Sequence, residues 1–179
     1  GGGDKAWLTR DGQPQVERWR RRFVAEVATI LVSANREPER YERIGLHAVR
    51  DRSTADLGPV AGLDALAAAC ETPWLLTLPV DLVGVNDCLV PSLVATAQSH
   101  GAFAVDDDGP QPLVALWPVR SLREATTRAI EAGDLAIHSL QRHLRMVPVR
   151  LEGVRFGNLN TPQDLAAAGV VPGEPDGRN

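Results

Sequence analysis

The hydrophobic positions of this chain alternate between short continuous runs and segments with helical spacing. Residues 27–33 (VATILVS) and 74–80 (WLLTLPV) are continuously apolar, which is typical of strands buried on both faces. Between residues 14 and 26, apolar side chains recur every three or four positions, which predicts an amphipathic helix. The two patterns follow one another along the whole chain.

The same reading gives a full set of expected elements. An extended segment is expected at 6–9, and strands at 27–33, 46–49, 74–80, 102–105, 113–117, 146–151 and 154–156. Helices are expected at 14–26, 61–70, 87–99 (starting near Pro91), 121–132 (Ser121 and Glu124 forming a capping box, Gly133 ending it), 135–144 and 162–168 (capped by Thr161). Alternating strands and helices predict an α/β fold with a mostly parallel sheet covered on both faces, in a single domain spanning 1–179. The Pro/Gly-rich tail, 170–179, is expected to be flexible.

Composition excludes several classes of protein. The 179 residues are 44% hydrophobic with a formal net charge of −4, and no apolar run reaches the roughly 18 residues of a membrane-spanning helix. The opening GGGDK has neither a basic nor an apolar stretch, so we expect no signal peptide. Cys70 and Cys88 are expected to be core thiols in the reducing cytoplasm. The acidic balance argues against nucleic-acid binding.

Polar residues follow three of the expected strands. Asn35 and Asp51 come just after the first two, and Asp81 directly follows the strand at 74–80. In open α/β sheets, ligands bind beyond the carboxyl ends of the strands, so these side chains are expected to converge on one crevice. A carboxylate in the position of Asp81 can hold Mg²⁺ against substrate phosphates, and no obvious helix start follows it that would make it a cap.

Lys5 stands out by composition. It is the only lysine among 19 Lys and Arg residues, and it follows three glycines that include Gly2. Glycines let backbone amides approach a phosphate, and a lysine can supply a point charge to it. The glycines could equally be a cloning remnant, and the lysine a chance survivor at the surface. The segment matches neither the P-loop nor the GxGxxG pattern.

Two further segments could contribute to a site. Gly62 lies in GPVAG ahead of a helix, where close helix packing explains it better than anion binding at a helix N-terminus. Asn158 and Asn160 face the same side of an extended segment and could grip a heterocycle or a phosphate. A turn before the Thr161 cap would also account for Asn160, but not for Asn158. No histidine spacing predicts a metal site, and no GxSxG elbow predicts a serine hydrolase.

In this order the segments resemble successive motifs of the molybdenum cofactor guanylyltransferases, relatives of the sugar-nucleotide transferases. The matching segments are GGGDK, SANR (33–36), Asp51 after a short strand, GPVAG (58–62), LPVD (78–81) and FGNLNTPQDL (156–165). The family pattern opens with a strand and a LAGGxxxRM loop ahead of GGGDK, and this sequence starts at GGGDK. If the protein itself begins here, we expect the central sheet to lack one strand and the nucleotide affinity to be reduced.

The resemblance implies a three-layer, Rossmann-like, GT-A-like nucleotidyltransferase that moves GMP from GTP to the terminal phosphate of molybdopterin and releases pyrophosphate. Lys5 would contact the GTP phosphates, Asp51 would contribute to the nucleotide site, and Asp81 would bind nucleotide and Mg²⁺, which makes Asp81 and Lys5 the catalytic residues. At Ser33 the family often has Asn, so Asn35 is the neighbouring candidate for a nucleotide contact. Gly2, Gly62, Asn158 and Asn160 would line the molybdopterin side.

Several alternatives stay open at this point. The chain could be a related cytidylyl or sugar-phosphate nucleotidyltransferase, because base preference depends on a few loop contacts. It could also be a catalytically silent cofactor-binding protein of the same fold. Molybdoenzymes and cofactor-insertion proteins are further candidate partners.

Overall fold

The structure is a computed structural model that describes residues 5–171. Its largest sheet has four strands, which lie in the order β5, β8, β7, β9. Their bounds are Trp74–Thr77 for β5, Gly109–Pro118 for β8, Ala102–Asp106 for β7 and Val147–Arg150 for β9. β5, β7 and β9 run in one direction, while β8 is antiparallel to both of its neighbours.

The α/β class is confirmed, and so is the mostly parallel sheet, because β8 alone runs against the other three strands. Only β7 and β9 form a parallel pair there. The turn between Asp106 and Gly109 is too short for a crossover helix, so β7 and β8 form a hairpin. Asp106 stabilises this turn by accepting hydrogen bonds from the backbone N–H groups of Asp108 and Gly109, both at 3.0 Å.

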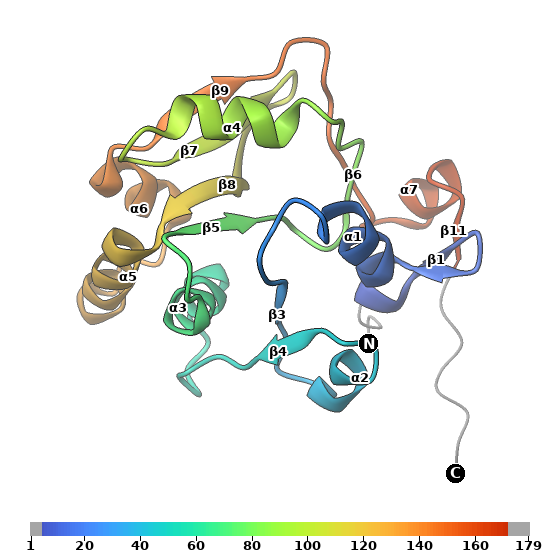
Figure 1. Ribbon diagram of the computed structural model, residues 1–179, viewed down its shortest axis with the longest axis horizontal. Helices are drawn as coiled ribbons and strands as arrows, with labels where there is room; N and C mark the ends of the chain where they lie inside the picture. The colour runs from blue at the N-terminus through green and yellow to red at the C-terminus, as the bar shows by residue number, and fades with distance from the viewer. Residues whose placement is uncertain (1–4, 172–179) are drawn as a thin grey trace.

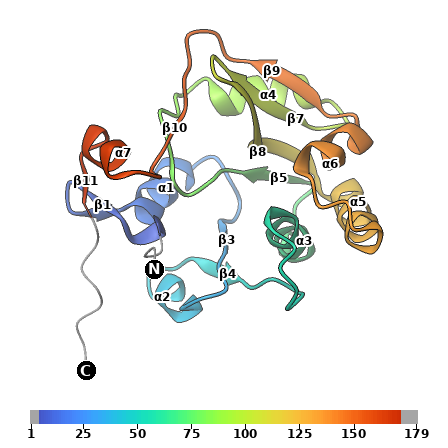
Figure 2. The same ribbon diagram turned by 180° about the vertical axis from the view of Figure 1, so that it is seen from behind.

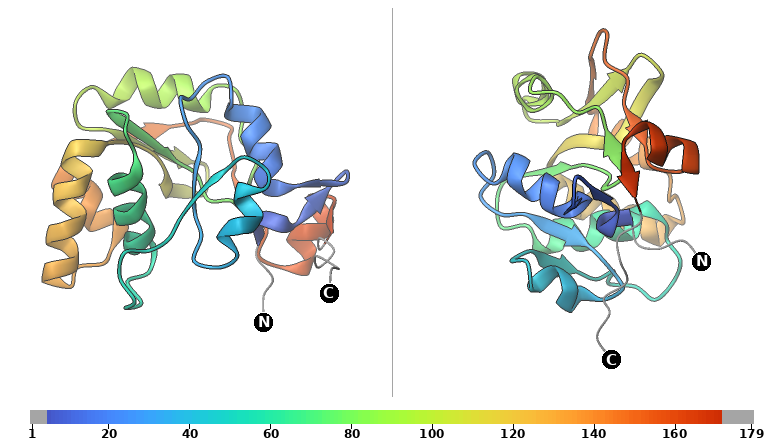
Figure 3. Two further views of the ribbon diagram at one scale, coloured as in Figure 1. Left: turned by 60° about the horizontal axis from the view of Figure 1, so that its bottom comes forward. Right: turned by 90° about the vertical axis from the view of Figure 1, so that its right-hand side faces the viewer.

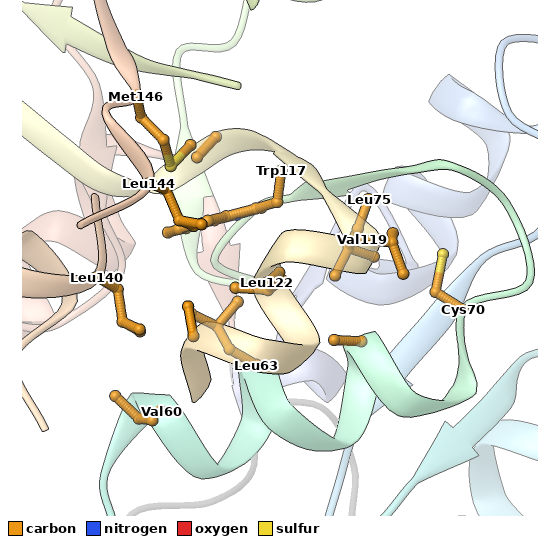
Figure 4. Packing of buried hydrophobic residues seen from close by; sticks show 13 residues of the cluster. Val60, Leu63, Cys70, Leu75, Trp117, Val119, Leu122, Leu140, Leu144 and Met146 are labelled. Atoms are coloured by element: carbon orange, nitrogen blue, oxygen red, sulfur yellow. The ribbon is translucent and has the colours of Figure 1, made fainter. Parts of the chain in front are cut away.

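Helices cover both faces of the sheet, which confirms the three layers (Figure 1). The helices α3 (Pro59–Ala69), α5 (Val119–Ala132) and α6 (Ile137–Leu144) pack on one face, and α4 (Leu89–Ala97) packs on the other. Because strand side chains alternate, Trp117 of β8 enters the first cluster, shown in Figure 4, and Leu116 enters the second.

A smaller unit carries the N-terminal part of the chain. β3 (Leu31–Ser33) and β4 (His47–Val49) form a separate parallel pair, with α2 (Pro38–Glu42) packed against β4. The 3₁₀ helix η1 (Lys5–Trp7) and the helix α1 (Gln15–Phe23) complete this unit. The strand expected at 27–33 is shorter than expected, because only its last three residues find a partner strand.

The two ends of the described chain lie side by side (Figures 2 and 3). β11 (Val170–Val171) pairs with β1 (Thr9–Arg10), which also pairs with β2 (Gln13–Pro14). The expectation of a flexible tail was therefore wrong for Val170 and Val171, and the rest of that tail lies outside the described residues. Close by, β6 (Leu82–Val83) pairs with β10 (Gly157–Asn158), followed by α7 (Pro162–Ala167).

Several local expectations have clear outcomes. The helical cap at Thr161 and the helix end at Gly133 are confirmed. The capping box at Ser121 was wrong, because α5 begins two residues earlier, after Pro118 at the end of β8. The expected extended segment 6–9 begins instead as η1, and no strand covers 154–156.

Two remaining expectations concern the cysteines and membranes. Cys70 is buried as expected, whereas Cys88 is exposed just before α4, so the expectation of two core thiols was wrong for Cys88. Within residues 5–171, no helix is both long and apolar enough to cross a membrane.

Candidate functional site

Lys5, Asp81 and Asn160 come from three distant parts of the sequence and meet at one point. The Lys5 ammonium lies 2.7 Å from Oδ2 of Asp81 and also donates a hydrogen bond to Oδ1 of Asn160. The Asp81 side chain is only 18% exposed, so its ion pair with Lys5 is partly shielded from water. Two oxygens from separate segments therefore face one cation.

Backbone pairing explains why Asp81 and Asn160 lie together. Asp81 immediately precedes β6, and the antiparallel register of β6 and β10 places Leu82 opposite Asn158. The backbone N–H of Leu159 then donates to the carbonyl of Asp81 at 3.0 Å. The loop after β5 and the segment before α7 are thus joined at Asp81 and at Leu82.

Asp164, which the sequence analysis missed, fixes the segment that carries Asn160. Its Oδ2 accepts hydrogen bonds from the backbone N–H of Thr161 at 2.8 Å and of Asn160 at 3.3 Å, while its own N–H donates to Thr161 Oγ1 at 3.1 Å. The hydrogen bonds from Thr161 and the nearby charge of Lys5 lower the pKa of Asp164. The spacing of Thr161 and Asp164, a capping box with Asp in the Glu position, is the signal that could have revealed it.

Asn35 and Asp51 form a second polar pair, at the ends of β3 and β4. Asn35 Nδ2 donates to Asp51 Oδ2 at 2.8 Å, and the backbone N–H of Asp51 donates to Asn35 Oδ1 at 2.9 Å. Both residues line a cavity of about 460 Å³, together with the loop that leads to Gly58. The other carboxylate oxygen of Asp51 is buried and has no hydrogen-bond partner among the described residues.

A shared hydrophobic cluster connects the two polar groups. Ala6 and Ala34 belong to it and Val80 packs against it, and these three directly adjoin Lys5, Asn35 and Asp81 in the sequence. The convergence of Asn35 and Asp51 with Asp81 on one crevice stays a prediction.

The remaining predicted residues belong to neither of these two polar groups. Gly62 lies in α3 against β3, where an added Cβ would come within 2.9 Å of Ser33 Oγ; this is the close helix packing favoured by the sequence. Asn158 lies on β10 with an exposed side chain. Gly2 lies outside the described residues. The structure thus brings together Lys5, Asp81 and Asn160, pairs Asn35 with Asp51, and places Gly62 beside Ser33.

The donor set around Lys5 has a defined coordination chemistry. Among residues 5–171, no group of three or more His, Cys, Asp or Glu side chains could hold a metal ion. One carboxylate and one amide oxygen at a common point suit Mg²⁺, which takes few protein ligands and completes its shell with water and phosphate oxygens.

Comparisons with known proteins agree on one family. Residues 1–149 match the family model of the MobA-like NTP transferase domain. A molybdenum cofactor guanylyltransferase of Shewanella sp. is 33% identical over 91% of this chain and 85% of its own length, and one of Yersinia pseudotuberculosis is 30% identical over 92% and 85%.

Solved structures share the fold at lower identity. Molybdopterin-guanine dinucleotide biosynthesis protein A of Archaeoglobus fulgidus superposes with a TM-score of 0.71 at 18% identity, over 94% of this chain and 90% of that one. The 2-C-methyl-D-erythritol 4-phosphate cytidylyltransferase of Thermus thermophilus gives 0.72 at 21% identity, over 94% and 93%. The chain therefore belongs to the MobA-like NTP transferase domain family and is a nucleotidyltransferase whose relatives act in molybdenum cofactor biosynthesis.

Proposed function

We propose that this protein transfers GMP from GTP to the terminal phosphate of molybdopterin and releases pyrophosphate. The observation that carries the proposal is the meeting of Lys5, Asp81 and Asn160 at one point. A phosphate oxygen of molybdopterin forms a bond to the α-phosphorus of GTP, and the bond from that phosphorus to the bridging β-phosphate oxygen breaks. The relatives named molybdenum cofactor guanylyltransferase support GTP and molybdopterin as the substrates.

Asp81 and Asn160 are the proposed ligands of Mg²⁺. Their two oxygens already converge on a cation, the ammonium of Lys5. When bound, Mg²⁺ offsets phosphate charge during phosphoryl transfer. The role of Asp81 and Asn160 is to hold their oxygens at a fixed point, which the pairing of β6 with β10 supports.

Lys5 is the proposed phosphate contact. A lysine ammonium is a compact charge on a flexible stem, so Lys5 can leave Asp81 for a phosphate oxygen with little rearrangement of the backbone. The Lys5 side chain is 40% exposed, so it has room for this movement. There its ammonium balances part of the negative charge of the triphosphate.

Asn35 and Asp51 are the proposed nucleotide-positioning residues. The buried, unpartnered oxygen of Asp51 is an acceptor that a donor group of the bound nucleotide can satisfy. The cavity of about 460 Å³ is of the size that small-molecule ligands occupy. Gly2, Gly62 and Asn158 remain the proposed molybdopterin side, with the absence of a Cβ at Gly62 leaving room for the Ser33 hydroxyl.

The test is pyrophosphate release from GTP with Mg²⁺ and molybdopterin. Asp81→Asn keeps the side-chain shape but removes the charge, and it should lower turnover by about 10²-fold or more. The matched control is Asp87→Asn, an exposed carboxylate six residues on whose partner is Arg22. Near-normal turnover in Asp81→Asn would reject the proposal.

A cytidylyltransferase is the second candidate, because the Thermus thermophilus cytidylyltransferase matches the fold as well as the Archaeoglobus fulgidus protein does. Competition between GTP, CTP and ATP for the wild-type chain separates the two candidates. A clear preference for CTP would replace GTP in the proposal and leave the roles of Asp81 and Lys5 unchanged.

A further inference from the structure

A second cavity lies at the end of the four-stranded sheet that is opposite to Asp81. Asp81 follows the end of β5, whereas this cavity lies where β5, β7 and β9 begin. There Trp74 pairs with Pro118, and Ala102 pairs with both Leu116 and Val147. Its volume is about 280 Å³, and its walls include His100, Ser121, His143 and Arg145.

Tight backbone packing fixes the walls of this cavity. Gly101 has a φ of +86°, and a Cβ there would lie 2.6 Å from the carbonyl oxygen of Leu116 and 2.9 Å from Cδ of Pro118. The backbone N–H of Val147 donates to the carbonyl of Gly101 at 3.0 Å. His100 precedes Gly101 directly, and Arg145 lies two residues before Val147. Both are therefore held at the same end of the sheet.

The cavity is locally cationic in an acidic protein. Its lining includes two arginines, Arg128 and Arg145, and two histidines, His100 and His143. The single carboxylate among the described residues that line it is Glu124, and this lies 3.8 Å from Arg128, which balances its charge. No second carboxylate among the described lining residues balances the positive charge of Arg145. The chain as a whole, in contrast, carries a formal net charge of −4.

The N-terminus of α5 favours a negatively charged ligand at this place, and the C-terminus of α6 holds Arg145 there. The first turn of α5 contains no acidic residue, and no side chain caps it, while Pro118 and Ser121 at this end line the cavity. Arg145 ends α6 in a left-handed conformation with a φ of +56°, where glycine is the usual and less strained residue. The chain thus keeps a guanidinium at a position where the backbone alone would favour glycine.

We propose that this cavity binds a small oxyanion of the phosphate class. Arg145 supplies the planar pair of N–H donors that suits phosphate oxygens, and the Ser121 hydroxyl and the His100 ring supply further hydrogen-bonding groups. The site is separate from the one around Asp81 and does not depend on the identity of the nucleotide or acceptor used there.

Arg145 provides a test that separates binding from folding. Inorganic phosphate is titrated into the full chain at constant ionic strength, and the backbone amide resonances of His100, Ser121 and Arg145 are followed by NMR. Arg145→Gly removes the guanidinium and relieves the left-handed backbone, so its melting temperature should equal or exceed that of the wild type. Its phosphate affinity should fall by at least about tenfold, as should that of Arg145→Gln.

The matched control is Arg120→Gln, which removes the same charge from the exposed first turn of α5, outside the cavity lining. Saturable shifts at the cavity that survive in Arg120→Gln and disappear in both Arg145 variants would support the proposal. Shifts that chloride reproduces, that never saturate, or that the control variant weakens equally would overturn it.

Discussion

Asp106 and Phe156 are linked by a hydrogen bond of 2.8 Å from the backbone N–H of Phe156 to the carboxylate of Asp106, fifty positions earlier in the chain. The same carboxylate holds the β7–β8 hairpin through Asp108 and Gly109. Burial raises the pKa of Asp106, but the hydrogen bonds from Phe156, Gln111, Asp108 and Gly109 outweigh it and lower the pKa below its usual value. One side chain thus ties the sheet to the segment that leads to Asn160.

Replacing Asp106 should therefore destabilise the protein. Asp106→Asn keeps one acceptor oxygen but loses the charge, so the free energy of unfolding should fall by about 2 kcal/mol, measured by urea denaturation at pH 7. Asp107→Asn, at the exposed neighbour, is the control and should have almost no effect.

The contribution of Asp106 also has a defined pH dependence. A carboxylate whose pKa is lower in the folded state stabilises the fold above its unfolded pKa, and this contribution disappears as the pH falls through the folded value. The difference in unfolding free energy between wild type and Asp106→Asn should be constant near neutrality and shrink below about pH 4. A difference that grows in acid would contradict this account.

Asp164 should influence catalysis through Asn160 and Lys5. Asp164→Ala removes the acceptor for the backbone N–H groups of Asn160 and Thr161, so Asn160 should no longer hold Lys5 at a fixed position. We expect kcat for pyrophosphate release to fall by roughly tenfold, with a smaller change in KM for GTP.

The control for Asp164 lies next to it in α7. Gln163→Ala changes an exposed side chain of the same helix and should leave kcat unchanged. If Asp164→Ala lowers the melting temperature but leaves kcat intact, its role is confined to capping α7.

Asn35 should influence nucleotide affinity. Asn35→Ala removes both hydrogen bonds that hold Asp51, each of which contributes about 1 kcal/mol. The Kd for GTP, measured by calorimetry, should rise by roughly tenfold. An unchanged Kd would mean that the pair at Asn35 and Asp51 does not contact the nucleotide.

Gly62 and Gly101 should respond differently to alanine. In Gly62→Ala the new Cβ meets the Ser33 hydroxyl, which can rotate away, and alanine improves the helix by about 1 kcal/mol, so the melting temperature should hold or rise. In Gly101→Ala the Cβ meets the backbone oxygen of Leu116 at a positive φ, and the loss should be about 3 kcal/mol. Thermal unfolding of the two variants tests this contrast.

Sequence reasoning predicted the elements better than their pairing. Helical periodicity located α3 and α5, and the Thr161 cap located α7, because these signals are local. The run at 27–33 was predicted too long, because its length as a strand depends on which segment pairs with it, and only Leu31, Val32 and Ser33 find partners in β4.

In the candidate site too, single residues were predicted better than the contacts between them. Asp81 was predicted from its position after an apolar strand, and Lys5 from being the only lysine, near three glycines; the structure does place the two together. Asn160 was assigned to molybdopterin, yet its side chain contacts Lys5, a relationship set by the register of β6 and β10. A register between segments more than seventy residues apart leaves no trace in the spacing of either one.

The meeting of Lys5, Asp81 and Asn160 also has a consequence for the life of the protein before it is released from the ribosome. These residues come from the beginning, the middle and the end of the described chain, and the ribosome exposes them at widely separated times. A nascent chain that has folded α3, β5 and α4 still lacks Asn160 and the strand that holds the Asp81 loop. Catalytic competence should therefore arrive only after β10 and Asn160 have emerged, and chains truncated before β10 should never turn over substrate.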